Sequence, residues 1–150
     1  MNIKGEKKQS DVRFCCPVCS FDLWLPLAPL QVSVLGFYDD ARFPGRCILA
    51  LNEHCEDFST LDRQVASSFF IDCQKAARAI KAAVNVDRVN IAILGNEVAH
   101  VHFHLIPRRP ENEPIPRRPP WEHPQAKRPL PEIRRLEISS RIKEDLSKLK

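Results

Sequence analysis

The chain has 150 residues, of which 43% are hydrophobic and 28% charged, so it can form one domain with a genuine core but not two. Residues 1–13 form a polar leader without the apolar stretch of a signal peptide. The most apolar run, residues 24–37, is broken by Pro26 and Pro29 and is too short to span a bilayer. We therefore expect a cytoplasmic protein with no membrane segment.

The net charge of +4 is unevenly distributed, because basic residues crowd the last third of the chain. Such a bias would attract an anionic ligand, although Arg117, Arg118 and Lys127 fit a plain solvated surface equally well. The chain has two Trp, one Tyr and no recognisable nucleic-acid motif, so a polynucleotide partner is not expected. The basic residues in question are Arg108, Arg109, Arg117, Arg118, Lys127, Arg128, Arg134 and Arg135.

The first predicted elements are two strands. Residues 30–40 carry a strand pattern that closes in a polar turn, and residues 47–51 carry a second one after the turn-forming pair Pro44–Gly45. Their short connection predicts an antiparallel pair.

A long helix follows these strands. Apolar residues recur at spacings of three and four from Leu61 to Val84, which predicts one buried stripe. We expect Ser59 or Thr60 to cap the helix, with Asp62 close to the positive end of its dipole.

The second half of the chain predicts two further strands and a terminal helix. Residues 88–94 and 99–108 have strand patterns and are separated by a turn at Gly95–Asn96. Nine of the thirteen prolines lie between Pro107 and Pro131, so residues 110–129 should be extended and irregular. Residues 130–150 predict an amphipathic helix. Its apolar stripe is formed by Leu130, Ile133, Ile142, Leu146 and Leu149, with Leu136 and Ile138 less well placed.

Three of the five histidines lie in one run, His100-Val101-His102-Phe103-His104-Leu105-Ile106. Alternate side chains of a strand face the same way, so the three imidazoles should share one face. They could bind a single metal ion, or they could act as a row that handles an anion. In the second case the central ring would attack phosphorus while a backbone carbonyl fixes its other nitrogen, and its neighbour would donate a hydrogen bond to the phosphoryl oxygens.

This run resembles the signature of the histidine triad (HIT) superfamily of nucleotide hydrolases and transferases, in which three histidines alternate with apolar residues. The likeness extends over roughly residues 14–109 and includes the segment "YDDARFPGRCILALNEHCEDFSTLD". It implies an α+β, HIT-like fold with an antiparallel sheet of about five strands, one long helix and a C-terminal helix. It also implies a homodimer.

The resemblance implies a mechanism as well. His102 would take the nucleoside monophosphoryl group as a phosphohistidine, and His104 would hydrogen-bond the phosphoryl oxygens. The substrate would be cleaved at its α-phosphate and would be a dinucleoside polyphosphate, a nucleotide phosphoramidate or an AMP conjugate.

Four further residues are carried over as substrate contacts. The family's Gly-Gln pair before the triad falls on Gly95–Asn96, so Asn96 would lie near the scissile phosphate, in a loop that starts at Asn90. The family's acidic ribose-binding residue falls on Asp39 or Asp40, of which we select Asp40, although both also fit plain turn residues. Arg108 belongs to the "PR" pair that follows the triad.

A metal site is predicted next to the triad. Cys16-Pro17-Val18-Cys19 has the spacing of a zinc knuckle, which supplies two of four ligands. The resemblance supplies the other two, because zinc-containing members place ligands at the positions of His54 and His100. Such a closed set of ligands would make the zinc structural. The alternative is a turn with free thiols, with His54 capping a helix.

Two other functions remain open on the sequence. One is a zinc-stabilised module that binds nucleotides without turnover, and the other is a metallohydrolase that uses all three triad histidines as ligands of a catalytic metal.

Overall fold

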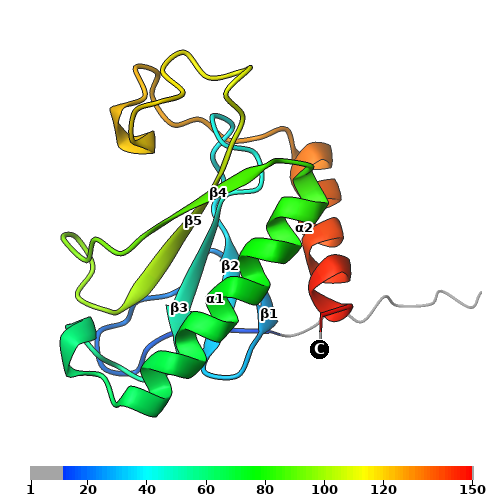
Figure 1. The fold of residues 1–150 in the computed structure, drawn as a ribbon. Coiled ribbons are helices and arrows are strands. Elements are labelled where there is room, and N and C mark those ends of the chain that lie inside the picture. The colour runs from blue at the N-terminus through cyan, green and yellow to red at the C-terminus, as the bar shows by residue number, and fades with distance from the viewer. Residues whose placement is uncertain (1–11, 150) are drawn as a thin grey trace, which may run out of the picture.

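A five-stranded antiparallel sheet with two helices is the framework of the protein in the computed structural model, which describes residues 12–149 (Figure 1). This confirms the predicted α+β, HIT-like fold; most of the predicted leader, residues 1–11, lies outside the described residues. No described helix is long and apolar enough to cross a membrane. The strands, in the spatial order β1-β2-β3-β5-β4, are β1 (Leu25–Pro29), β2 (Ser33–Phe37), β3 (Cys47–Leu51), β4 (Arg88–Ala92) and β5 (His102–Arg108). The helices are α1 (Arg63–Val84), α2 (Glu132–Ser147) and the short 3₁₀ turns η1 (Phe58–Thr60) and η2 (Pro120–Glu122).

Strand β1 is the element that the sequence pattern did not predict. Its two prolines lack the N–H group that a ladder needs, so the segment does not read as a strand. The structure places β1 at the edge of the sheet, where prolines are tolerated, and its register against β2 shifts between Pro26 and Ala28.

The pairing of β3 with β5 separates the two faces of the sheet. Leu49 lies opposite Phe103 on the face towards α1, where the Phe103 ring stacks on Phe69 at 4.3 Å between centroids. The next positions alternate to the other face, so His104 lies opposite Ile48 there. The sheet therefore holds the imidazoles in place by burying their apolar neighbours.

Strand β5 is shorter than predicted, because it begins at His102 and not at residue 99. The peptide N–H of Val101 donates to the carbonyl of Cys55 at 2.8 Å, which draws the chain before β5 towards the loop after β3. His100 consequently lies outside the strand. The prediction that one strand carries all three histidines was wrong for the first of them.

The N-terminus of α1 also differs from the prediction. Asp62 caps the helix, accepting hydrogen bonds from the backbone N–H groups of Gln64 at 2.8 Å and Val65 at 3.3 Å. Ser59 and Thr60 belong to η1 instead, because Asp57 caps that turn in the same way.

The triad face of the sheet is covered by the chain before β1. Leu23 packs on Val34 and Ala50 in a small apolar cluster. Gly36 makes this close approach feasible, because a Cβ at position 36 would meet the Leu23 side chain at 3.0 Å. The chain that contains the predicted knuckle is thereby held against β2 and β3, and β3 is the neighbour of the strand that carries His102 and His104.

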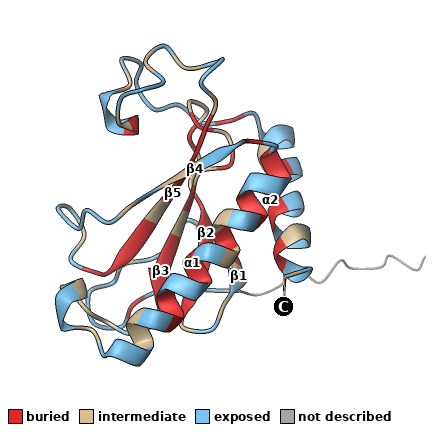
Figure 2. Cartoon of the chain, in the orientation of Figure 1, coloured by how far each residue is buried: buried red, intermediate tan, exposed pale blue. Residues whose placement is uncertain are grey.

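Helix α2 packs against α1 and against β1, so its buried face points inward and its outer face is exposed (Figure 2). Ile138, Ile142 and Leu146 form the buried stripe at a spacing of four. Ile133 is 83% exposed, so its predicted place in the stripe was wrong, as was the weaker placing of Ile138, which is 1% exposed. These two isoleucines are five positions apart, so their side chains point in directions about 140° apart around the helix axis.

Replacing Ile138 with Ala should lower the free energy of unfolding by about 2–5 kcal/mol, because it leaves a cavity between the helices. The same substitution at Ile133 should change it by less than about 0.5 kcal/mol. Urea denaturation followed by circular dichroism measures both values. Equal losses at the two positions would contradict the observed rotation of α2.

Candidate active site and metal centre

A cavity of about 750 Å³ opens on the triad face of the sheet. His102 and His104 lie in its wall, and Asn96 lines it from the exposed loop between β4 and β5. The remaining wall comes from the chain before β1, from the end of β2 and the residues that follow it, from Arg46 and Ile48, and from residues 127–129. Both triad histidines that belong to β5 therefore face one space large enough for a nucleotide.

The ring of His102 is held by the backbone next to it. Its Nδ1 lies 2.5 Å from the carbonyl oxygen of His100, so Nδ1–H donates and Nε2 keeps its lone pair. Burial lowers the pKa of His102, and the nearby His100 adds to this effect against the opposing influence of the hydrogen bond. The side chain is consequently a neutral imidazole at pH 7, which is the form that can act as a nucleophile.

His104 is oriented by an arginine. The Nη2 of Arg46 lies 3.4 Å from Nδ1 of His104, and the ring centroids of His102 and His104 are 5.0 Å apart. Burial, followed by the charges of Arg46 and His102, lowers the pKa of His104 to about 4. A neutral ring whose Nδ1 accepts a hydrogen bond must carry its proton on Nε2. The Nε2–H group is therefore the one hydrogen-bond donor of the His104 ring.

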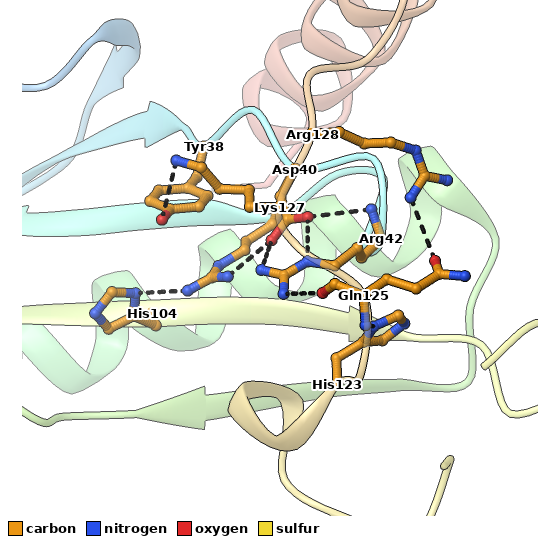
Figure 3. A network of polar contacts seen from close by, with 9 residues as sticks. Tyr38, Asp40, Arg42, His104, His123, Gln125, Lys127 and Arg128 are labelled. Carbon is orange, nitrogen blue, oxygen red and sulfur yellow. Dashed lines mark hydrogen bonds and ion pairs between the residues drawn. The ribbon is translucent and has the colours of Figure 1, made fainter. Parts of the chain in front are cut away.

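Asp40 lies at the centre of an ion-pair network behind His104 (Figure 3). Its fully buried carboxylate accepts from Nε and Nη2 of Arg42 at 2.9 and 2.8 Å and from Nη1 of Arg46 at 3.0 Å. Burial raises the pKa of Asp40, but the hydrogen bonds and charge of Arg42, with the charge of Arg46, hold it below its ordinary value. The structure thus places this predicted ribose contact among guanidinium groups. Its neighbour Asp39 lines the cavity and accepts from Arg135.

Asn90 and Arg108 are joined to each other at a distance from the triad. Nη1 of Arg108 donates to Oδ1 of Asn90 at 2.6 Å, and the Arg108 side chain pairs with Glu113 and binds the carbonyls of Pro116 and Arg118. Neither Asn90 nor Arg108 is among the described residues that line the cavity. Through these contacts, Arg108 and Asn90 hold the turn after β5 against the sheet.

An aromatic and cationic part of the cavity wall was not predicted from the sequence. Tyr38 follows β2, and two cations lie over its ring. The Cζ of Arg46 is 4.1 Å and the Nζ of Lys127 is 4.5 Å from the ring centroid. Lys127 also donates to the Tyr38 hydroxyl at 3.4 Å. The two-residue period of β3 provided a signal for Arg46, because position 46 shares a face with Ile48, which lies opposite His104.

The four predicted metal ligands lie together. Sγ of Cys16 is 3.6 Å from Nδ1 of His54, Sγ of Cys19 is 3.4 Å from Nδ1 of His100, and all four ligand atoms lie within 4.8 Å of one another. A tetrahedral zinc ion with ordinary bond lengths to sulfur and nitrogen sets such atoms about 3.6 Å apart. The donor set and its spacing therefore fit zinc.

The contacts of His100 argue against a metal ion shared by the three triad histidines. Its Nδ1 faces Cys19, and its Nε2 lies 2.8 Å from the carbonyl oxygen of Leu51, an outer contact that fixes the ring. With Nδ1 of His102 held by a backbone carbonyl, the rings do not converge on one point. The geometry separates a Cys/His cluster from a pair of histidines in the cavity.

The sequence matches the family model of the HIT domain over residues 32–111, which is more than half of the chain. The chain therefore belongs to the HIT family. Comparison with curated protein sequences gives no match.

Solved structures show the same fold. A histidine triad protein from Sinorhizobium meliloti 1021 is similar with a TM-score of 0.73 and 25% identity, over 81% of this chain and 88% of that one. A Zn-bound histidine triad family protein from Mycobacterium smegmatis gives 0.62 and 19%, over 83% and 84%. Plasmodium falciparum diadenosine triphosphate hydrolase gives 0.60 and 15%, over 96% and 88%. The last two similarities concern the fold alone.

Replacing Asp40 with Asn should lower the free energy of unfolding by about 3–5 kcal/mol, because Arg42 and Arg46 lose their buried counter-charge. The pKa of the carboxyl is held below its ordinary 3.8, so this stabilisation is complete above that pH and is lost as the pH falls below it. Urea denaturation at pH 7 measures the effect, and Asn at the exposed Asp87 is the control. An Asp40 variant of unchanged stability that only binds substrate less well would contradict this role.

Proposed function

We propose that the protein is a nucleotidyl hydrolase or transferase that cleaves at the α-phosphate of a nucleotide through a phosphohistidine on His102. The observation that carries the proposal is the backbone hydrogen bond at Nδ1 of His102, which leaves a neutral Nε2 in the wall of a nucleotide-sized cavity. Membership of the HIT family supports the same reaction class.

The first step forms a bond between Nε2 of His102 and the α-phosphorus. The bond from phosphorus to the leaving group breaks, and its electron pair stays with that group, which takes up a proton from solvent. The carbonyl of His100 accepts from Nδ1–H and stabilises the positive charge that develops on the ring. His104 donates from Nε2–H to a phosphoryl oxygen as negative charge builds there.

The second step releases the nucleotide. A water molecule, or another acceptor in a transferase, attacks phosphorus and gives up its proton, while the phosphorus–nitrogen bond breaks and returns its electron pair to Nε2. The products are a nucleoside monophosphate and the original neutral imidazole. Each step is a single displacement at phosphorus, so no redox partner is required.

We propose an adenine nucleotide as substrate, within the classes of dinucleoside polyphosphates, nucleotide phosphoramidates and AMP conjugates. The similarity in fold to a diadenosine triphosphate hydrolase supports the first class. Asn96 would contact the substrate, and its position in the cavity lining, in the loop between β4 and β5, supports this role. Asp40, Asn90 and Arg108 would act indirectly, through the positions of Arg46 and of the turn after β5.

We also propose that Cys16, Cys19, His54 and His100 hold a structural zinc ion. Four protein ligands would complete its tetrahedral shell, so the ion would cross-link the chain before β1, the loop after β3 and the residues just before β5. It would leave no open position for chemistry. The ligand distances and the Zn-bound relative of similar fold support this assignment.

A homodimer is a further part of the proposal. Large apolar side chains lie exposed on one side of α1 and along β4 and the loop after it, which is a surface typical of an interface. These side chains are Phe70, Ile71, Ile91, Ile93 and Leu94.

Replacing His102 with Ala should lower kcat by at least about 10³-fold, because the attacking nitrogen is removed. Release of AMP from a panel of adenine dinucleotides and AMP phosphoramidates, read by chromatography, measures this loss. His123→Ala is the matched control, since its ring contacts Phe43 and lies outside the cavity lining. Equal release by wild type and the His102 variant would exclude this nucleophile, and nucleotide binding without release by wild type would favour the binding module.

Replacing Cys16 with Ser should remove the zinc, and it should lower the melting temperature by several degrees because the cross-link is lost. Metal content per chain, measured by mass spectrometry of the purified protein, is the readout. Cys15→Ser and His102→Ala should keep one zinc per chain, because neither side chain belongs to the cluster. Loss of the metal from the His102 variant would favour the metallohydrolase instead.

A further inference from the structure

Arg46 is the residue that connects the buried ion-pair network to the triad. Its side chain is 13% exposed and makes three different contacts: Nη1 with Asp40, Nη2 with Nδ1 of His104, and the guanidinium group with the ring of Tyr38. The buried carboxylate of Asp40 holds the Nη1 end of the guanidinium group, and the Tyr38 ring packs against the group. Little freedom remains at the end that meets His104.

A guanidinium restricts the protonation of an imidazole more strongly than most neighbours. It offers only donors and remains charged at all ordinary pH values. Nδ1 of His104 must therefore accept, and the single proton of the neutral ring must lie on Nε2. The same positive charge opposes the addition of a second proton.

The groups around His104 reinforce this state. His102 faces it from β5, and Tyr38 faces it from the end of β2 with ring centroids 6.5 Å apart. Lys127 reaches the same tyrosine ring from the C-terminal segment. Burial and the Arg46 charge keep the pKa of His104 far below neutrality.

Arg42 provides an internal comparison. It pairs with the same carboxylate of Asp40, through Nε and Nη2, but its Nη1 donates to the carbonyl of Gln125 and the triad is not among its contacts. A purely structural role for the network would make the two arginines equivalent. Of these two arginines, Arg46 lines the cavity that the triad histidines of β5 also line, and Arg42 does not.

We propose that Arg46 is a positioning residue of the active site: anchored by Asp40 and Tyr38, it fixes His104 as the tautomer whose Nε2–H donates to the transferred phosphoryl group. This inference rests on the proposed function for its catalytic consequence. The tautomer itself is a property of the free protein.

Nitrogen-15 NMR of the histidine rings tests the tautomer without substrate. In wild type at pH 7, His104, assigned by comparison with His104→Asn, should show a protonated Nε2 and an unprotonated Nδ1. Arg46→Met should give a mixture of both tautomers and a ring that titrates closer to the ordinary histidine range. Arg42→Met should leave the tautomer of His104 unchanged.

Activity gives the second readout. Arg46→Met should lower kcat by about tenfold to hundredfold with little change in KM, and Arg46→Lys should recover part of the loss because it retains a donor and a charge. A proton on Nδ1 of His104 in wild type, or the same tautomer in wild type and Arg46→Met, would overturn the proposal. If Arg46→Met fails to fold, the wild-type tautomer and Arg46→Lys still decide it. Absence of turnover in wild type would defeat the proposed function and leave the NMR result standing.

Discussion

The hydrogen bond between Nδ1 of His102 and the carbonyl of His100 is the interaction on which the site depends. An imidazole can present a lone pair in one direction only if its proton is held in the other. Here the partner is a main-chain atom, which does not change its protonation state. The same residue, His100, has its ring in the Cys/His cluster and its carbonyl on the ring of His102, so a shift of the cluster would also shift the His102 ring.

That coupling explains why the histidines alternate but serve different purposes. Phe103 packs on Phe69 from one face of the sheet, and this burial fixes the direction of His102 and His104 on the other. His100 lies just before the strand, where the backbone has turned towards the loop after β3. One short segment thereby holds the proposed metal ligand, the proposed nucleophile and the proposed hydrogen-bond donor.

Much of this arrangement could be read from the sequence. The two-residue period placed His102 and His104 on a common face, and the cysteine spacing with the family resemblance brought Cys16, Cys19, His54 and His100 together. The local pattern did not reveal β1, because prolines at an edge strand look like a break. On α2 it placed Ile142 and Leu146 correctly in the buried stripe. It wrongly included the exposed Ile133 and ranked Ile138 too low, since tertiary packing buries Ile138.

The contacts that sequence reasoning missed share one physical cause. Arg46, Tyr38 and Lys127 meet only because the sheet, the turn after β2 and the C-terminal segment come together in space. A buried carboxylate, Asp40, looked like a turn residue or a ribose contact because charge patterns along a chain do not reveal which guanidinium will reach it. Partner choice in such networks is a property of the folded chain.

The most direct measurement of the central claim is the mass of the protein during turnover. Wild type mixed with an adenine dinucleotide and quenched under alkaline conditions, which preserve phosphohistidine, should gain one nucleoside monophosphoryl group. Peptide mapping should locate that group on His102. An enzyme that turns over with no such adduct, or with the group on another residue, would contradict the account.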